Sequence, residues 1–176
     1  REVLPLVRAN AGGTLTPDPD GRAAMGISSS GVASFTMAWF RPDLYRRVLA
    51  YSPTFMNQQW PRDPALRGGA WEYHSPWAGN RSGEPRSTPL VLAAPAKPIR
   101  MWYVSGDQDL FYPIGRMADG MHDFTLGSAN MAKALAAKNY QYQFIFAKNG
   151  QHVDLPLIRQ TLPYALEWVW QGYPRQ

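Results

Sequence analysis

Short runs of β-forming residues alternate along this chain with stretches of helical periodicity, and this alternation is the feature that most constrains the fold. The predicted strands are residues 22–27, 47–52, 99–106 and 142–147. The predicted helices are residues 2–10, 30–40, 128–139 and 155–170. Strands that alternate with helices build βαβ units, whose right-handed crossovers place the strands in a parallel sheet. The sequence therefore predicts the α/β class, with a mostly parallel sheet flanked by helices.

Residues 53–98 interrupt the alternation. They are rich in Pro, Gly and Trp and lack clear periodicity, and long connections of this kind are usually functional or partly structured. We interpret them as an irregular insertion or cap region within a single domain that spans residues 1–176. Two details of the helices are also predicted: Ser128 caps the start of the third helix, and Pro163 bends or divides the fourth.

The composition excludes several classes of function. The chain has 18 Lys and Arg against 13 Asp and Glu, a formal net charge of +5 at pH 7. The basic residues are scattered and form no patch interleaved with aromatic residues, so we expect no nucleic-acid partner. The absence of cysteine excludes disulfides, thiolate zinc sites and a cysteine nucleophile. No run of about 18 apolar residues occurs, so we expect no transmembrane helix and no membrane partner. The sequence does not identify the compartment, although a periplasmic or secreted bacterial location is favoured.

Three consecutive serines, Ser28, Ser29 and Ser30, lie at the junction between the strand 22–27 and the helix that follows it. The segment GISSSG resembles the G-x-S-x-G nucleophile elbow of α/β-hydrolases, in which a strained strand-to-helix turn exposes a serine hydroxyl above the sheet. Its first glycine and its serine match Gly26 and Ser28, whereas Ser30 stands at the second glycine. A serine cluster can also be only a helix cap, so the motif alone leaves both interpretations open.

The order of further candidate residues along the chain favours the catalytic interpretation. Asp109 follows the predicted strand 99–106, and His152 follows the predicted strand 142–147. Both therefore lie, like Ser28, at carboxyl ends of strands, where open α/β sheets build their sites. A serine hydroxyl becomes nucleophilic when an imidazole accepts its proton, and a carboxylate fixes the tautomer and orientation of that imidazole. The order serine, acid, histidine is the one that α/β-hydrolases use.

Competing residues remain for the acid and the base. Asp107 lies close to Asp109, and we favour Asp109 because it lies further past the strand end and is free to turn toward the histidine. Asp107 is placed to cap the turn. His74 and His122 are the other histidines, and both lie away from a predicted strand end. The backbone N–H of Ser29, the residue after the nucleophile, would supply half of an oxyanion hole.

These residues lie in segments that resemble the enterochelin-esterase-like branch of the α/β-hydrolases, the group near esterase D, feruloyl esterases and acetyl xylan esterases. The segments are GRAAMGISSSGVASFTMAWFRPDLYRRVLAYSPTF, IRMWYVSGDQDL, ANMAKALAAKNYQYQFIFAKNGQH and LPYALEWVWQGYP. The resemblance implies the α/β-hydrolase fold, with the family's nucleophile on Ser28, its acid on Asp109 and its base on His152. It implies a serine esterase that forms an acyl-enzyme, needs no metal or organic cofactor, and acts on a small-molecule or carbohydrate-linked ester.

Two alternative functions remain. One is an acyltransferase with the same triad, and the other is a catalytically silent esterase-like module that binds glycan or peptide through aromatic residues of 53–98. The resemblance also implies that the chain is the C-terminal part of its fold, because no predicted strand corresponds to the one that leads into the other half of the oxyanion hole. We therefore expect the strand 22–27 to form an open edge, covered by upstream residues of a longer natural protein or by a second chain.

Overall fold

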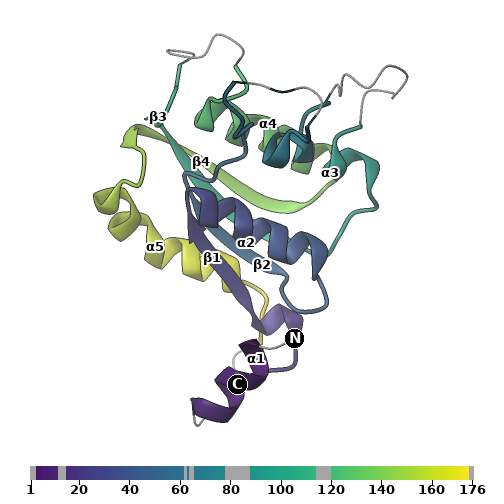
Figure 1. Cartoon of the computed structure of the whole chain (residues 1–176). Helices are drawn as coiled ribbons and strands as arrows, with labels where there is room; N and C mark the ends of the chain where they lie inside the picture. Colours follow the sequence, from purple (N-terminus) through teal and green to yellow (C-terminus); the bar gives the residue numbers. More distant parts are fainter. Residues whose placement is uncertain are drawn as a thin grey trace.

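The computed structural model describes residues 3–11, 15–61, 63, 66–77, 88–113 and 120–174. The described strands form a 4-stranded sheet in the order β1-β2-β3-β4, in which every neighbouring pair runs parallel (Figure 1). They are β1 (Ala23–Ile27), β2 (Arg47–Tyr51), β3 (Arg100–Gln108) and β4 (Gln141–Gln151). All lie where the sequence predicts strands, so the prediction of a parallel α/β sheet is confirmed.

Helices connect the strands and cover both faces of the sheet (Figure 1). The long helices beside the sheet are α2 (Ser29–Phe40), α4 (Phe124–Ala137) and α5 (Leu155–Trp170). The shorter elements are α1 (Val3–Asn10), η1 (Pro19–Gly21), η2 (Gly69–Tyr73) and α3 (Leu90–Ala93). Among the described helices, none combines the length and the apolar character that a membrane span requires.

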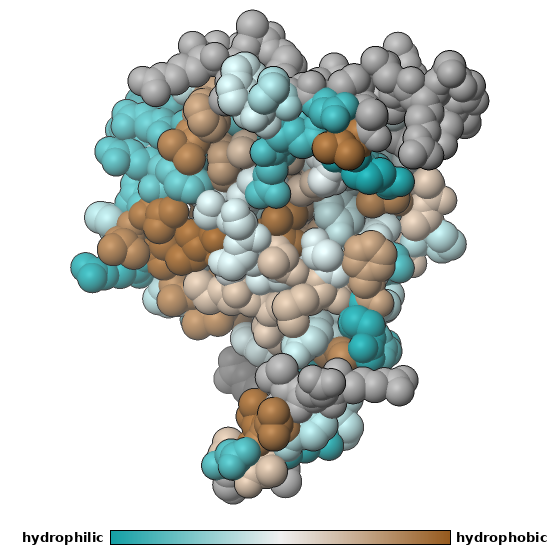
Figure 2. All heavy atoms as spheres, in the orientation of Figure 1, coloured by the Kyte–Doolittle hydropathy of each residue, from teal (hydrophilic) through white to brown (hydrophobic). Residues whose placement is uncertain are grey.

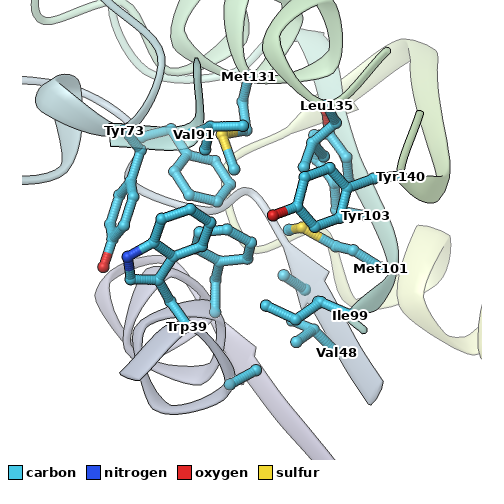
Figure 3. Close-up of a cluster of buried hydrophobic side chains, with 14 of the residues drawn as sticks. Trp39, Val48, Tyr73, Val91, Ile99, Met101, Tyr103, Met131, Leu135 and Tyr140 are labelled. Carbon is cyan, nitrogen blue, oxygen red and sulfur yellow. The ribbon is translucent and has the colours of Figure 1, made fainter. Parts of the chain in front are cut away.

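Two clusters of buried apolar side chains hold the helices on opposite faces of the sheet. The first includes Trp39 of α2, Leu135 of α4 and, from the strands, Val48 and Tyr103 (Figure 3). The second lies under α5 and consists of Leu49, Tyr51, Trp102, Val104, Ala147, Ile158, Ala165 and Val169. Neighbouring residues of β2 enter different clusters because side chains alternate along a strand. Burial on both faces accounts for the continuous apolar run in β2.

The start of α4 differs from the sequence prediction. The helix begins at Phe124, and its N-cap is Asp123, whose carboxylate accepts a hydrogen bond from the N–H of Leu126 at 2.7 Å. The predicted cap, Ser128, is buried within α4, where its Oγ lies 2.8 Å from the Oγ of Ser105. The prediction was wrong because a charged carboxylate upstream provides the stronger acceptor for the free N–H groups of the first turn.

Pro163 does not divide α5, which runs from Leu155 to Trp170. A proline inside a helix removes one backbone hydrogen bond. Here Ile158 on one side of Pro163 and Val169 on the other are both buried against the sheet. Tertiary packing therefore holds the two parts of the helix together. Of the two predicted effects of Pro163, a bend or a division, the division is wrong.

The described residues of the region 53–98 take part in the core. Phe55, Tyr73 and Val91 belong to the same cluster as α2 and α4, and the ring of Phe55 lies edge-on against those of Tyr73 and Tyr103. Residues 62, 64, 65 and 78–87 of this region lie outside the described residues. The described part of the predicted insertion thus packs as an integral part of the domain.

β1 lies at one edge of the described sheet and pairs only with β2. Met25 is in register with Leu49, so its side chain lies on the α5 face of the sheet, yet it is 47% exposed. Apolar side chains gather on the surface over β1 and α5 in the space-filling view (Figure 2). In the described part of the chain, an unpaired strand edge therefore lies beside exposed apolar surface.

Candidate active site

The turn between β1 and α2 holds Ser28 in a strained backbone conformation. Ser28 has φ 57° and ψ −124°, a combination that residues with a side chain rarely adopt. Its N–H donates to the carbonyl oxygen of Tyr51 at 2.9 Å, which extends the pairing of β1 with β2 into the turn. A Cβ at Gly26 would lie 2.0 Å from the carbonyl oxygen of Ser30, so the turn can close this tightly only with glycine there. These are the features of a nucleophile elbow.

Ser30, which replaces the second glycine of the elbow motif, bonds to the end of β1. Its Oγ accepts a hydrogen bond from the N–H of Ile27 at 2.8 Å and donates one to the carbonyl oxygen of Ile27 at 2.7 Å. Alternate residues of a parallel strand bond to the same neighbour, and Ser28 bonds to β2, so the peptide groups of Ile27 face the open edge. The departure from the motif therefore satisfies two groups that a glycine would leave without a partner in the described residues.

Two hydrogen bonds join Ser28, His152 and Asp109, each of which is the first residue after its strand. Ser28 Oγ lies 3.1 Å from His152 Nε2, and His152 Nδ1 lies 2.7 Å from Asp109 Oδ1. An ionised carboxylate only accepts hydrogen bonds, so Nδ1 donates its proton to Asp109. In the neutral ring Nε2 is then the acceptor for the serine hydroxyl. The structure thus brings together the three side chains that the sequence analysis selected.

The surroundings of Asp109 and His152 restrict the orientation of the imidazole. Asp109 is 3% exposed, and its Oδ1 also accepts a hydrogen bond from the N–H of Leu110 at 2.8 Å. The other oxygen, Oδ2, is buried and has no hydrogen-bond partner among the described residues. The ring of His152 packs edge-on against Phe124, with the ring centroids 4.7 Å apart. Carboxylate and phenyl ring together hold the imidazole toward Ser28.

Phe124 is the residue beside the site that the sequence analysis missed. It is the first residue of α4, and its N–H donates to the carbonyl oxygen of Leu110 at 3.3 Å, which connects α4 to the loop that carries Asp109. The sequence pattern predicts that this helix begins at Ser128, which leaves Phe124 in the preceding connection with no expected partner. Asp123 is the sequence signal for this residue: aspartate is a favourable N-cap, and a cap at Asp123 makes Phe124 the first residue of the helix.

Asp107, the competing candidate for the acid, contacts a different element. Its Oδ1 accepts a hydrogen bond from the N–H of Asn149 at 2.6 Å. This contact joins β3 to β4 next to the place where their pairing shifts register, between Gly106 and Gln108. The carboxylate thus stabilises the ends of the two strands, close to the turn-capping role expected from the sequence.

The two other histidines bind backbone carbonyl groups away from Ser28. His74 is buried, with Nε2 2.7 Å from the carbonyl oxygen of Phe55 and Nδ1 2.8 Å from Ser75 Oγ. Burial lowers the pKa of His74 to about 4, against a smaller opposing effect of the hydrogen bond to Phe55. His122 Nε2 lies 2.6 Å from the carbonyl oxygen of Gln59. Within the described residues, no three His, Asp or Glu side chains are grouped so that they could hold a metal ion.

Ser29 is the first residue of α2, so its N–H lies at the amino end of that helix. The first N–H groups of a helix have no acceptor within it, and the helix dipole adds partial positive charge there. The peptide group that carries this N–H is fixed, because the carbonyl oxygen of Ser28 accepts hydrogen bonds from Gly31 at 2.9 Å and Thr54 at 3.2 Å. The geometry therefore provides a positioned donor beside Ser28 Oγ, of the kind that oxyanion holes use.

One protein-family model matches the sequence over most of its length. It is the model Esterase, described as "Putative esterase", and the match covers residues 1–163. The chain belongs to the esterase family. The resemblance expected from the sequence is thereby confirmed. Among curated proteins, none matches this sequence.

Solved structures of several esterases and hydrolases share the fold of this member of the esterase family. A ferulic acid esterase superposes with a TM-score of 0.60 at 17% identity, over 95% of this chain and 58% of that chain. Enterochelin esterase from Shigella flexneri gives 0.59 at 19% identity, over 97% of this chain and 35% of that one. FphF, a fluorophosphonate-binding serine hydrolase from Staphylococcus aureus, gives 0.61 at 18% identity, over 97% of this chain and 62% of that one. The expected α/β-hydrolase fold is confirmed, and the chain spans less than two thirds of the length of each of these proteins.

Proposed function

We propose that this chain carries the catalytic residues of a serine esterase that hydrolyses carboxylic esters through an acyl-enzyme. Ser28 is the nucleophile, His152 is the general base and acid, and Asp109 orients the imidazole and stabilises its charged form. The observation that carries the proposal is the pair of hydrogen bonds from Ser28 Oγ through His152 to Asp109, at 3.1 and 2.7 Å. Membership of the esterase family supports the same class of reaction.

In the first half-reaction, Ser28 Oγ attacks the ester carbonyl carbon while its proton moves to His152 Nε2. The imidazolium that forms lies against the carboxylate of Asp109, which stabilises it. The substrate carbonyl oxygen becomes an oxyanion, and the N–H of Ser29 donates to it; one such donor contributes about 3 kcal/mol in the transition state. Breakage of the carbon–oxygen bond of the ester then releases the alcohol, which takes the proton from Nε2 and leaves Ser28 acylated.

In the second half-reaction, a water molecule attacks the acyl-enzyme and gives its proton to His152 Nε2. Collapse of the tetrahedral intermediate returns that proton to Ser28 Oγ and releases the carboxylic acid. A sugar hydroxyl in place of water would make the chain an acyltransferase, because the same side chains serve either acceptor. A silent binding module has no need of a serine, a histidine and a carboxylate in hydrogen-bonded order, so the site favours catalysis.

For the substrate we propose a small-molecule or carbohydrate-linked ester. Two of the structural neighbours are named for ferulic acid and for enterochelin, which makes feruloyl and catecholate esters the first compounds to compare. An acetylated sugar extends the panel to carbohydrate esters. If the acyl group appears only as free carboxylic acid, the chain is a hydrolase. If an acceptor sugar becomes acylated, the chain is an acyltransferase.

Replacement of His152 by alanine tests the proposal with p-nitrophenyl acetate as substrate. The change removes the group that accepts the proton of Ser28, so we expect kcat to fall by about 10⁴-fold or more. His74→Ala and His122→Ala serve as controls and should keep most of the activity, because these imidazoles bind backbone carbonyl groups away from Ser28. Turnover by the His152 variant close to that of the unchanged chain would refute the proposed base.

We further propose that the open edge of β1 pairs with another strand, from a longer form of this protein or from a second chain. Support comes from the position of β1 at the edge of the described sheet and from the exposed side chain of Met25 beside it. An unpaired, apolar strand edge tends to pair or to aggregate. In this proposal the added strand also leads into the loop that supplies the second oxyanion N–H.

A further inference from the structure

A cavity of about 320 Å³ lies at the opposite end of the sheet from Ser28, where the strands begin. Arg47, Arg100 and Gln141 are the first residues of β2, β3 and β4, and all of them line it. Arg46 and Lys97 from the preceding loops complete its polar wall. The cavity therefore collects cationic side chains from several elements, although the chain as a whole scatters its basic residues.

Positive charge in this cavity exceeds negative charge. Among the described residues that line it, the cations are Arg46, Arg47, Lys97 and Arg100, and the only carboxylate is that of Asp20. Asp20 Oδ2 accepts a hydrogen bond from Arg46 Nη1 at 2.8 Å. Within the described residues, no carboxylate pairs with the other three cations. The cavity thus contains charge that the described residues leave uncompensated.

Arg47 and Arg100 are fixed in place by neutral groups. They are directly opposite each other in the pairing of β2 with β3, an arrangement that costs stability when both residues carry the same charge. Arg47 is 7% exposed and donates to the carbonyl oxygens of Asp20 and Val169. Arg100 donates to the carbonyl oxygen of Trp168 at 2.9 Å, and its guanidinium lies 3.9 Å from the centre of the Trp168 ring. Carbonyl oxygens at the end of α5 thus position both guanidinium groups without neutralising their full charge.

Three of the four cations have N–H groups that donate no hydrogen bond within the described residues. The Nη2 atoms of Arg46 and Arg47 donate to no acceptor among the described residues. Lys97 Nζ lies 4.8 Å from the centre of the Trp39 ring and likewise makes no hydrogen bond within that part of the chain. The Trp39 ring therefore positions the ammonium group of Lys97, and the N–H groups of that ammonium can still donate to a ligand.

We infer that this cavity binds a compact oxyanion of the phosphate or sulfate class. Such an anion presents several acceptor oxygens to guanidinium and ammonium donors, and charge-assisted bonds of this kind are the strong ones in proteins. It also compensates the like charges that Arg47 and Arg100 place opposite each other. The ligand is either the free anion or the anionic group of a monoester. The site lies at the other end of the sheet from Ser28, so it does not depend on ester hydrolysis.

Isothermal titration calorimetry with inorganic phosphate and with sulfate, at constant ionic strength, tests the inference on the 176-residue chain. We expect saturable binding at one site by the unchanged chain and a Kd at least about tenfold weaker in Lys97→Met, which loses a charged donor. Methionine keeps an unbranched side chain to pack on Trp39. Lys133→Met is the matched control, since Lys133 is an exposed lysine of α4 outside the cavity.

A parallel titration with glucose 6-phosphate separates the two sources of the anion. A smaller Kd for the monoester assigns the site to a phosphorylated molecule, and an equal or larger one assigns it to the free anion; both results support the site. The inference is overturned if no saturable heat is seen with phosphate, sulfate or the monoester. It is equally overturned if Lys97→Met, folded by circular dichroism, binds as tightly as Lys133→Met.

Discussion

Each histidine in the described chain has a different set of partners, and the partners decide what it can do. His152 bonds to a carboxylate on one side and to a serine hydroxyl on the other. The ring of His74 packs against Trp71, and its two nitrogens form hydrogen bonds with the carbonyl oxygen of Phe55 and with Ser75 Oγ. Only His152 combines partial exposure with a carboxylate partner, which is the environment that a general base in an ester hydrolase requires.

Asp109→Asn should lower kcat far more than Asp107→Asn. The amide no longer holds the Nδ1–H tautomer of His152, and a change of this kind lowers kcat by about 10⁴-fold in related triads. Asp107 bonds to the N–H of Asn149, so its replacement should cost less than about tenfold in rate. Steady-state kinetics on p-nitrophenyl acetate make the comparison. A larger loss in the Asp107 variant would mean that the acid has been assigned to the wrong carboxylate.

His74 should make the chain less stable in mild acid. Its pKa is 6.5 when exposed and about 4 in the folded chain because of burial. As the pH falls from 6.5 toward about 4, the unfolded chain takes up a proton that the folded chain does not, so folding stability decreases across this window. The full effect is on the order of 3 kcal/mol.

Urea denaturation at several pH values, with His74→Gln as comparison, measures this effect. Glutamine can still donate to the carbonyl oxygen of Phe55 but does not titrate. The variant should therefore lose less stability than the unchanged chain between neutral pH and pH values near 4. Parallel stability curves for the two proteins over this range would exclude His74 as the acid-sensitive group.

At the scale of elements, the turn from β1 to α2 determines where the reactive hydroxyl lies. The strained φ of Ser28 directs its side chain out of the turn, while Gly26 allows the first turn of α2 to approach β1. The hydroxyl of Ser30 bonds to both peptide groups of Ile27. The strained backbone of Ser28, the close packing at Gly26 and the two hydrogen bonds of Ser30 thus fix the turn that carries the hydroxyl.

Gly26→Ala should disrupt this turn, whereas Gly31→Ala should be tolerated. A methyl group at Gly26 would lie 2.0 Å from the carbonyl oxygen of Ser30, and backbone must move to relieve that contact. We expect a loss of roughly 3 kcal/mol or more in the free energy of unfolding, together with loss of esterase activity. At Gly31 the nearest atoms belong to Pro53 at 3.2 Å, and higher helix propensity offsets the contact by up to about 1 kcal/mol.

The predicted difference between Gly26→Ala and Gly31→Ala can be measured by thermal denaturation and by the rate of p-nitrophenyl acetate hydrolysis. A Gly26 variant with unchanged melting temperature and rate would show that the turn does not need glycine at this position. If Gly31→Ala lowers the melting temperature and the rate as much as Gly26→Ala does, the turn tolerates a methyl group at neither glycine.

The elements could be predicted to different degrees from the sequence, for physical reasons. The strands were predictable because apolar runs such as β2 reflect burial on both faces. Ser28, Asp109 and His152 were predictable as candidates because each follows a strand end. Their mutual distances were not, since they depend on how β1, β3 and β4 are paired.

Other features depend on contacts that the strand and helix pattern does not predict. Phe124 packs on His152 because α4 begins at Phe124, capped by Asp123, rather than at Ser128. The cationic cavity forms because the register of β2 and β3 places Arg47 opposite Arg100, residues that lie far apart in the sequence. Scattered basic residues in a sequence can therefore be grouped in the fold.

At the scale of the whole molecule, the edge of β1 distinguishes this chain from a closed domain. The sheet is buried under α2 and α4 on one face and under α5 on the other, but Met25 of the edge strand β1 remains 47% exposed. Apolar surface next to an unpaired strand marks an interaction site. In the described residues, this edge supports the proposal that another strand pairs with β1.

We therefore expect the isolated chain to self-associate through β1, with Met25→Lys reducing the association. A charged side chain on an edge strand opposes pairing with a second strand. Leu166→Lys is the matched control, since Leu166 is 42% exposed but lies on α5 rather than on the strand. Light scattering coupled to size-exclusion chromatography gives the molar mass of each protein. A stable, well-folded and fully active monomer of the unchanged chain would show that the edge needs no partner.

Ser28, rather than the adjacent Ser29 or Ser30, is the proposed nucleophile of a serine esterase. The most direct measurement is tandem mass spectrometry of the folded chain after reaction with a fluorophosphonate, which modifies activated serine hydroxyls. We expect a single adduct on Ser28, absent from Ser28→Ala and strongly reduced in His152→Ala, because among these three serines only Ser28 is hydrogen-bonded to the imidazole. An adduct on Ser29 or Ser30, or no adduct on the folded chain, would contradict it.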